Sequence, residues 1–580
     1  MNNHLSHLKA KKLFSLLMLL LIAIIFIPTN TFSQINKFKG SDKTQLHHEI
    51  LDDNYINISR ENVKTSPAFR YKGKSVFTTQ VNIDENGNNI VGDAANEPSI
   101  AIDPTNPNRM VIGWRQFDDV TNNFRQAGYG YSLDGGQNWT FPGVIDPGVF
   151  RSDPVLDFDS EGNFYYNSLT SDASNNMTCK VYKIDDGGIE WDEGVEAQGG
   201  DKQWMRIDRT DGMGAGNNYS YWTQYWSSCY PGYFTRSVDL GTTFEDCVEI
   251  SGNPHWGTLA IGPEGELYTA GAGQYYGIIV TKSTFAQNPT FPVSWDFESQ
   301  VDLDGEVVGW DIVNPEGLLG QVWIDVDKSG GPGHGNVYVV SSVDRNSIND
   351  PSDVMFTKST DGATSWSSPL KINNDFATNN YQWFGTMSVA PNGRIDVIWL
   401  DTRESPQGIY LSALYYSFSI DRGETWSENK KLSDVFDSRV GWPNQEKMGD
   451  YYDMISDNEG AHLAWANTLN GEQDVYYSYI TPENVGIDDV NKTQKLLSLA
   501  SYPNPFVKET TIRYRLPESG AVQIIVYDIY GKKIKTLVDK NQQSGIYNIV
   551  FDADNLSKGI YYCHLQTGNH TETISLALIK

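Results

Sequence analysis

Short apolar runs that alternate with turns rich in Asp and Gly occupy most of the chain, and one arrangement of them repeats. An apolar run, a turn and a second apolar run recur seven times, roughly every 50–65 residues. Short runs bounded by turn residues predict antiparallel strands. A repeat of this length holds two hairpins, so we expect seven four-stranded sheets. The first runs begin near Glu97, Asp153, Gln203, His255, Gln321, Phe384 and Tyr451.

A second pattern, S-x-D-x-G-x-x-W, follows a strand-like run four times. Its Asp carboxylate is suited to accept the backbone N–H groups of a hairpin turn, and its Gly suits the position with positive φ. Its aromatic ring is suited to cover the base of the turn. The copies, one with Phe for Trp and one with Ala for Gly, comprise Ser132, Asp134, Gly136 and Trp139; Ser237, Asp239, Gly241 and Phe244; Ser359, Asp361 and Trp366; and Ser419, Asp421, Gly423 and Trp426.

This pattern resembles the Asp-box, or bacterial neuraminidase repeat (BNR), which marks turns in the blades of β-propellers. With the seven repeats, the resemblance predicts an all-β chain with a seven-bladed β-propeller over residues 71–482. The seventh unit has a third strand but no box, so we expect residues 75–81 to supply its outer strand. Such closure removes exposed edge strands. In its families the box lies on the rim, so it predicts the fold rather than the function.

The first 33 residues have the features of a signal peptide. Lys9, Lys11 and Lys12 precede the apolar run 13–27, and small and polar residues follow to Ser33. The alternative, an N-terminal membrane anchor, is disfavoured because the apolar run is short. No other segment is apolar enough to span a membrane, so we do not expect an integral membrane protein. Residues 34–70 are polar and unpatterned, and we expect a leader or linker there.

The tail after a predicted linker at 483–497 alternates again in the manner of strands. We expect a small immunoglobulin-like β-sandwich over residues 498–580. Pro503-Asn-Pro505, Val526 to Gly531, Gly559 to Tyr562 and the terminal Lys580 resemble the type A C-terminal sorting domain of the type IX secretion system. The resemblance implies export across the outer membrane and the secretion machinery as a partner. The alternative is an ordinary accessory immunoglobulin-like domain.

Charge and cysteine content limit which kinds of partner, metal or cofactor we expect. Lys and Arg total 44 against 73 Asp and Glu, a net charge of −29. This balance argues against nucleic acid or an anionic membrane as partner and suits a secreted or cell-surface protein. Cys229 and Cys247 flank the second box, where a disulfide is one option. No Cys-x-x-Cys pair or Cys/His cluster occurs, so we expect no metal site and no cofactor.

The candidate site follows from aligning the seven units, because the innermost strand of each blade lines the channel of a propeller. Carboxylates and aromatic rings at these positions suit a carbohydrate, with rings stacking and carboxylates binding hydroxyls or acting as acid and base. Glu97, Asp153, Asp201 and Asp450 are the catalytic candidates. We expect one cleft and at least one raised carboxylate pKa. The alternative is that these residues only cap the channel. The candidate ligand-binding residues are Glu97, Asp153, Asp201, Lys202, His255, Trp256, Gln321, Trp383, Asp450 and Tyr451.

Sialidase activity is disfavoured by the arginines. The resemblance would require three arginines for the substrate carboxylate, and none of the aligned positions is Arg. The nearest match to the sialidase F/Y-R-I-P motif, Phe150 to Pro154, is one residue too long. Three functions therefore stay open: a protein that binds glycans or another extracellular polymer, a glycoside hydrolase or lyase using the channel carboxylates, and a protein-binding scaffold.

Overall fold

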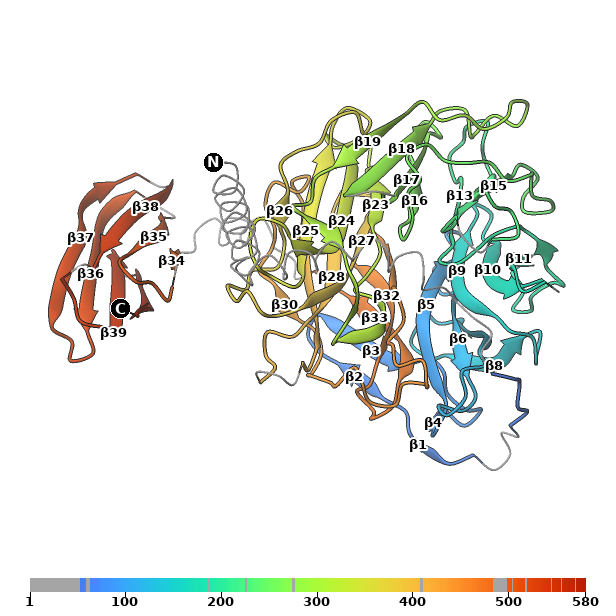
Figure 1. The fold of residues 1–580 in the computed structure, drawn as a ribbon, viewed down its shortest axis with the longest axis horizontal. Coiled ribbons are helices and arrows are strands. Elements are labelled where there is room, and N and C mark those ends of the chain that lie inside the picture. The colour runs from blue at the N-terminus through green and yellow to red at the C-terminus, as the bar shows by residue number, and fades with distance from the viewer. Residues whose placement is uncertain are drawn as a thin grey trace, which may run out of the picture. The chain divides into compact units, whose positions relative to one another are not determined.

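The computed structural model describes residues 53–58, 63–172, 174–185, 187–224, 227–273, 277–406, 410–482, 498–502, 504–516, 519–543, 545–553, 555–568 and 570–579. The predicted signal peptide, the predicted linker at 483–497 and part of the predicted leader lie outside these ranges. The chain divides into two compact units, Met1–Pro482 and Glu483–Lys580. Every regular element of the described residues is a β-strand, which confirms the all-β prediction (Figure 1).

The first four sheets of the first unit are antiparallel and follow the chain in order. Each begins with a strand from one apolar run of the repeat, and consecutive strands pair. Their strands are β5 (Ala94–Ile102), β6 (Met110–Phe117), β7 (Gln126–Ser132) and β8 (Thr140–Ile145); β9 (Ser152–Phe158), β10 (Phe164–Ser171), β11 (Met177–Ile184) and β12 (Val195–Glu196); β13 (Trp204–Ile207), β14 (Asn218–Tyr221) and β15 (Phe234–Ser237); and β16 (Leu259–Ile261), β17 (Leu267–Ala272), β18 (Ile278–Ser283) and β19 (Phe297–Val301).

The fifth to seventh sheets continue the series, with two departures. In the fifth sheet β20 (Gly305–Val307) also pairs with β24. Two small two-stranded sheets lie outside the series: β1 (Thr65–Pro67) with β4 (Asn88–Ile90), and the hairpin of β21 (Gly309–Asp311) and β22 (Asn314–Leu318). The fifth to seventh sheets comprise β23 (Trp323–Val326), β24 (Val337–Arg345), β25 (Asp353–Ser359) and β26 (Leu370–Lys371); β27 (Gln382–Val389), β28 (Ile395–Asp401), β29 (Ala413–Ser419) and β30 (Lys430–Lys431); and β31 (Asp453–Ser456), β32 (Ala461–Asn467) and β33 (Asp474–Ile480) with two N-terminal strands.

The first strands of the seven sheets are neighbours in a closed order. β5 contacts β9, β9 contacts β13, and the series continues through β16, β23, β27 and β31 back to β5. Large aromatic and aliphatic side chains fill the space between successive sheets, and Trp114, Trp204, Trp222, Trp383, Trp399 and Trp465 are fully buried. The first strands of the seven sheets therefore form a closed ring, and the apolar side chains between the sheets pack in several clusters.

The N-terminal strand β3 (Val76–Gln80) completes the seventh sheet. It pairs antiparallel with β33, from Val76 opposite Ile480 to Gln80 opposite Tyr476, as the sequence predicts (Figure 1). A further strand, β2 (Arg70–Lys72), pairs with the outer side of β3. This pairing satisfies the backbone N–H and C=O groups that would otherwise be exposed along the edge of β33.

The four S-x-D-x-G-x-x-W turns have the predicted hydrogen bond to the Asp carboxylate, and each also has a bond to the Ser hydroxyl that was not predicted from the sequence. Ser132 Oγ accepts the Gly136 N–H at 2.9 Å, and Asp134 accepts the Asn138 N–H at 2.9 Å. The same pair of contacts recurs in the other three turns. In each turn two successive residues have positive φ, including Ala363 at 71° where the other turns have Gly. The Trp426 ring lies edge-on against Phe356 of the fifth sheet, so this turn also ties neighbouring sheets together.

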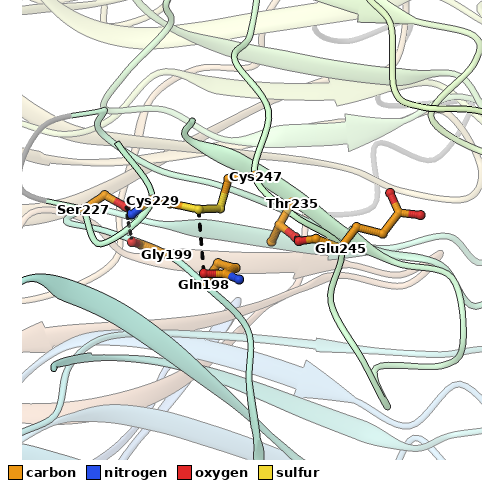
Figure 2. Close-up of a disulfide and its surroundings, with 7 residues drawn as sticks. All are labelled: Gln198, Gly199, Ser227, Cys229, Thr235, Glu245 and Cys247. Carbon is orange, nitrogen blue, oxygen red and sulfur yellow. Dashed lines mark hydrogen bonds between the residues drawn. A yellow bond between two sulfur atoms is a disulfide. The ribbon is translucent and has the colours of Figure 1, made fainter. Parts of the chain in front are cut away.

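Cys229 and Cys247 form a disulfide (Figure 2). Cys229 lies in the loop between β14 and β15, and Val248, beside Cys247, pairs with Phe234 at the edge of β15. The neighbouring Ser227 donates to the Gly199 carbonyl at 2.6 Å, which connects this loop to the end of the second sheet. The bridge therefore fastens a loop and an edge segment of the third sheet, where the fourth strand is reduced to a single bridge.

The second unit consists of two antiparallel sheets with one core. The first sheet has the order β34 (Ser498–Tyr502), β35 (Glu509–Leu516) and β38 (Gly545–Asp552). The second has the order β37 (Lys533–Gln542), β36 (Gly520–Asp528), β39 (Gly559–Thr567) and β40 (His570–Leu578). Apolar side chains from both sheets, among them Ile512, Phe551, Ile524 and Leu565, form its core.

Candidate functional site

The chain makes the same backbone bend shortly before each first strand or within its first four residues. Five non-glycine residues adopt a left-handed conformation there: Glu97, Asp153, Lys202, Trp256 and Phe384, with φ between 45° and 56°. In the fifth and seventh sheets the equivalent residues are Gly320 and Gly449. Such conformations are costly for non-glycine residues and persist where the surroundings enforce them. Gln321 and Asp450 therefore lie one residue later in the bend than the predicted alignment places them.

Asp450 is the centre of a buried charge network. Its Oδ2 lies 2.9 Å from both Lys202 Nζ and Lys447 Nζ, and its Oδ1 accepts the Leu318 N–H at 2.7 Å. Lys202 Nζ is also 3.5 Å from Asp201 Oδ1. The carboxylate thus joins residues from the third sheet, the β21–β22 hairpin and the seventh sheet.

Glu97 and Asp153 extend the network to the first and second sheets. Glu97 lies 3.2 Å from Arg115 Nε and 3.1 Å from Lys447 Nζ. Asp153 accepts the Lys202 N–H at 2.9 Å and the Ser152 hydroxyl at 2.7 Å. These contacts bring together five candidates that the sequence alignment groups, namely Glu97, Asp153, Asp201, Lys202 and Asp450.

The network holds the four carboxylates of Glu97, Asp153, Asp201 and Asp450 together with the cations of Arg115, Lys202 and Lys447. Burial raises the pKa of Glu97 to about 8, although Arg115 and Lys447 oppose the rise. The pKa of Asp450 is lowered well below its usual range, because Lys202, Lys447 and the Leu318 N–H outweigh its burial. The predicted rise of a carboxylate pKa is therefore found at Glu97, with burial rather than like charge as its main cause.

An aromatic cluster fills the space between the first strands. The ring centroid of Trp204 on β13 lies 5.1 Å from that of Trp323 on β23 and 5.1 Å from that of Tyr451. The Tyr451 hydroxyl donates to the Pro154 carbonyl at 2.7 Å. Side chains from the third, fifth and seventh sheets thus meet here, and Tyr451 also bonds to the backbone of the second sheet.

The β21–β22 hairpin lies against the bends of several first strands. Trp310 packs edge-on against Trp256 at 5.5 Å, and Asp311 accepts the Tyr381 hydroxyl at 2.8 Å. Asn314 donates to the Gly449 carbonyl and accepts the Met448 N–H, both at 2.8 Å. The hairpin therefore contacts residues of the fourth, sixth and seventh sheets and covers the bend that carries Asp450.

The sequence-predicted site is enclosed. Glu97, Asp153, Asp201, Lys202, Trp256, Gln321, Trp383, Asp450 and Tyr451 are each at most 2% exposed, and His255 is half-buried. The structure thus differs from the predicted open cleft, because the charged side chains pair with one another and the hairpin covers them. Trp383 packs on Phe384 and donates to Ser412 Oγ at 3.1 Å, between the sixth and seventh sheets rather than in the network.

Sequence reasoning missed Arg115, Lys447 and the hairpin. Lys447 lies three residues before Asp450, which is a weak signal, and Arg115 lies on β6 beside the bend at Glu97. The hairpin falls in the long segment between β19 and β23. Three arginines that lie in or just after the second strands of their units are paired with carboxylates: Arg115 with Glu97, Arg345 with Asp304 and Asp353, and Arg403 with Asp401. Within the described part of the chain, no group of three or more His, Cys, Asp or Glu side chains is placed to hold a metal ion.

Residues 500–580 match the family described as the secretion system C-terminal sorting domain. The tail is a sorting domain. It indicates export by the type IX secretion system, to the cell surface or the medium. Among the described residues, no helix has the length and apolar character needed to cross a membrane.

Several solved structures resemble the chain at low identity. A protein of unknown function from Dyadobacter fermentans is 11% identical, with 70% of this chain and 99% of that chain covered and a TM-score of 0.40. The BP39L lectin from Burkholderia pseudomallei is 13% identical, with coverages of 66% and 98% and a TM-score of 0.41. A polysaccharide lyase of family PL25, an ulvan lyase, is 11% identical, with coverages of 68% and 94% and a TM-score of 0.37. No curated protein matches the sequence. These likenesses are too distant to transfer an activity.

Proposed function

We propose that the first unit is a seven-bladed Asp-box β-propeller, exported by its sorting domain, that binds an extracellular glycan or another polymer without catalysis in its channel. The closed order of the seven first strands and the four similar turns support the fold. The observation that carries the binding function is that the four candidate catalytic carboxylates are buried and lie in a network with three cations. Carboxylates held in this way stabilise the ring and are closed to a polymeric substrate.

The surface that we assign to the ligand is the outer side of the β21–β22 hairpin and its neighbours. Trp310 and His255 are half-buried there, and Ile312 is 44% exposed. Tyr410 packs edge-on against Tyr381, whose hydroxyl is held by Asp311. Aromatic rings and an acidic side chain on one surface suit the C–H faces and hydroxyls of a sugar. On this proposal Glu97, Asp153, Asp201, Lys202 and Asp450 hold the surface in place, and Trp256 supports Trp310.

A glycoside hydrolase is the second candidate, and the raised pKa of Glu97 favours it. A carboxyl group with a pKa of about 8 is protonated at neutral pH, as a general acid must be. The β21–β22 hairpin would then have to leave the channel before the acid reaches a glycosidic oxygen.

A glycan array probed with the purified full-length chain separates these functions. We expect binding to a restricted set of glycans, a loss of at least about tenfold in affinity for Trp310→Ala, and little change for Glu97→Gln. Incubation with the bound glycans should release no reducing ends. Turnover that disappears in Glu97→Gln would establish the hydrolase, and binding unaffected by Trp310→Ala would place the ligand elsewhere. An array without a single binder would leave the protein-binding scaffold.

A further inference from the structure

Most of the large exposed hydrophobic side chains in the described part of the second unit gather at one end of its two sheets; Val550, on β38, is outside this group. Strand register defines this end. Asp528 at the end of β36 lies opposite Tyr561, and Gly559 at the start of β39 lies opposite Leu578. Phe506 forms a bridge with Leu578, which brings the end of the first sheet to the same place. The large exposed hydrophobic residues at this end, here called the tip surface, are Val507, Ile529, Tyr530, Ile560, Tyr562 and Ile579.

The other end of the unit has a different character. Ser498, the first described residue of the unit, lies opposite Arg515, and Leu516 lies opposite Gly545. Among the described residues near that end, around Gly520, Gln542 and Thr567, no large hydrophobic side chain is exposed. The tip surface therefore lies at the end remote from the point where the preceding chain enters the unit.

The most exposed part of the tip surface is an ordered turn. Tyr530 is 89% exposed and Ile529 is 59% exposed. Asp528 accepts the Tyr530 and Lys532 N–H groups, both at 2.9 Å, and the Gly531 N–H donates to the Asp528 carbonyl at 3.0 Å. These bonds fix the backbone and present the two side chains to solvent. A pre-ordered aromatic side chain loses little conformational freedom when a partner covers it.

Charge separates this surface from the rest of the chain. Residues 500–580 contain nine Lys and Arg against seven Asp and Glu, a net charge of +2 in a chain whose total is −29. Lys532, Lys533 and Lys558 are exposed beside the tip surface. An apolar turn flanked by lysines is complementary to an apolar pocket with a carboxylate rim.

We propose that the tip surface, with Tyr530 and Ile529 as its anchors, is where the sorting domain docks onto a protein of the secretion machinery through an apolar pocket with an acidic rim. This inference rests on the proposed export route. A protein partner is favoured over a lipid surface because the unit belongs to a family of sorting domains and because the anchors lie on a fixed turn. Two anchors on a rigid turn allow shape complementarity as well as apolar burial. A protein pocket requires both, whereas a fluid bilayer requires only the apolar burial.

The test is an export assay of the full-length chain in a bacterium that has this secretion system, with cell-surface and medium fractions compared with the periplasm. The double variant Ile529→Ala/Tyr530→Ala should lower export at least about tenfold, because buried aromatic anchors dominate such interfaces. Tyr530→Phe, which keeps the ring, should export normally. Lys532→Glu/Lys533→Glu should lower export, whereas Lys540→Glu, an exposed lysine towards the other end of the same hairpin, should not.

Three further measurements distinguish the export route, the folding of the variants and a lipid partner. Deletion of 498–580 tests the export route itself. If the deletion variant is exported normally, the proposed route is wrong. If the deletion variant is not exported but Ile529→Ala/Tyr530→Ala is exported normally, only the proposed role of the tip surface is wrong. The unfolding midpoint of each purified variant shows that lost export is not lost folding. Vesicles of anionic phosphatidylglycerol test the lipid alternative. Sedimentation of the full-length chain with them, abolished by the double alanine variant, would replace the protein partner with a membrane.

Discussion

The Asp450 carboxylate lies 2.9 Å from the Lys202 ammonium, and this ion pair joins the seventh sheet to the third. In the closed order of first strands, the first and second sheets lie between them. Both side chains are at most 2% exposed. A contact of this kind fixes the ring across its centre, whereas the hydrogen bonds of each sheet fix only neighbouring strands.

Replacing Asp450 should therefore destabilise the first unit strongly. Asp450→Asn leaves two ammonium groups buried beside a neutral amide, and breaking a buried ion pair in this way costs about 3–5 kcal/mol. Urea unfolding of the first unit measures the loss. Asp434→Asn, at an exposed carboxylate, is the control and should stay within about 0.5 kcal/mol of the parent. Equal stability of the two variants would show that the network contributes nothing.

The pH dependence of unfolding should report Glu97. Its pKa is raised from the ordinary value of 4.5 to about 8 in the folded chain, so between these values the folded state holds a proton that the unfolded state has released. The free energy of unfolding then falls as pH rises from about 5 to 8, by at most about 1.4 kcal/mol per pH unit for this group.

Glu97→Gln removes this titration, so its unfolding free energy should change less over the same pH range. The lowered pKa of Asp450 acts at acid pH in both proteins, so it cancels in the comparison. Parallel curves for parent and variant between pH 5 and 8 would contradict the raised pKa.

Gly449 should not tolerate a side chain. Its φ is 105°, and a Cβ there would lie 2.6 Å from Glu97 Cγ. Gly471 has a similar φ of 96° with nothing within 4 Å of its Cβ position, which makes it a matched control. Both alanine variants carry the left-handed cost of about 1–2 kcal/mol, and only Gly449→Ala adds an overpacking cost of about 1–3 kcal/mol. Chemical unfolding of the two variants gives the difference, and none should be seen if Glu97 moves aside freely.

The Ser359 hydroxyl should stabilise the third S-x-D-x-G-x-x-W turn. Its Oγ accepts the Ala363 N–H at 2.9 Å and donates to Asp361 at 2.7 Å, and both Ser359 and Ala363 are buried. Ser359→Ala leaves that N–H without a partner, at a cost of about 1–3 kcal/mol. Ser368→Ala, at an exposed serine just beyond the turn, should have little effect on the unfolding midpoint. A similar midpoint for both variants would mean that water replaces the hydroxyl.

Local patterns in this chain predict local structure well. The S-x-D-x-G-x-x-W turns form the expected bonds to the Asp carboxylate because Asp and the N–H groups that it accepts lie within a few positions of one another. The strand at 75–81 was predictable because, without it, the edge of β33 would have no pairing partner. The repeat also predicts that Glu97, Asp153, Lys202 and Asp450 come together, since equivalent positions of a repeat recur at one end of the inner strands.

The pairing of the charged side chains in the site, and the position of Trp383, were not predictable in the same way. The contacts of Asp450 depend on Lys202 and on Leu318, and neither their distance along the chain nor any motif signals the pairing. Gly320 and Gly449 occupy the bend, which shifts the alignment by one residue at Gln321 and Asp450. Trp383 precedes the bend at Phe384, where the register with β28 shifts, so its ring turns to Ser412 rather than to the network.

The pairing of β3 with β33 sets the order in which the first unit is completed. Strand β3 is synthesised early but cannot pair until β33, which ends at Ile480, has been made. Until then the sheets of the first unit form an open series with an unpaired edge at each end. Contacts of such sequence separation form late, because a long loop must close before they contribute any stability. A chain cut short before β33, or trimmed beyond β3, therefore exposes a β-edge able to pair with another copy. The pairing of β3 with β33 thus protects the first unit from edge-to-edge association.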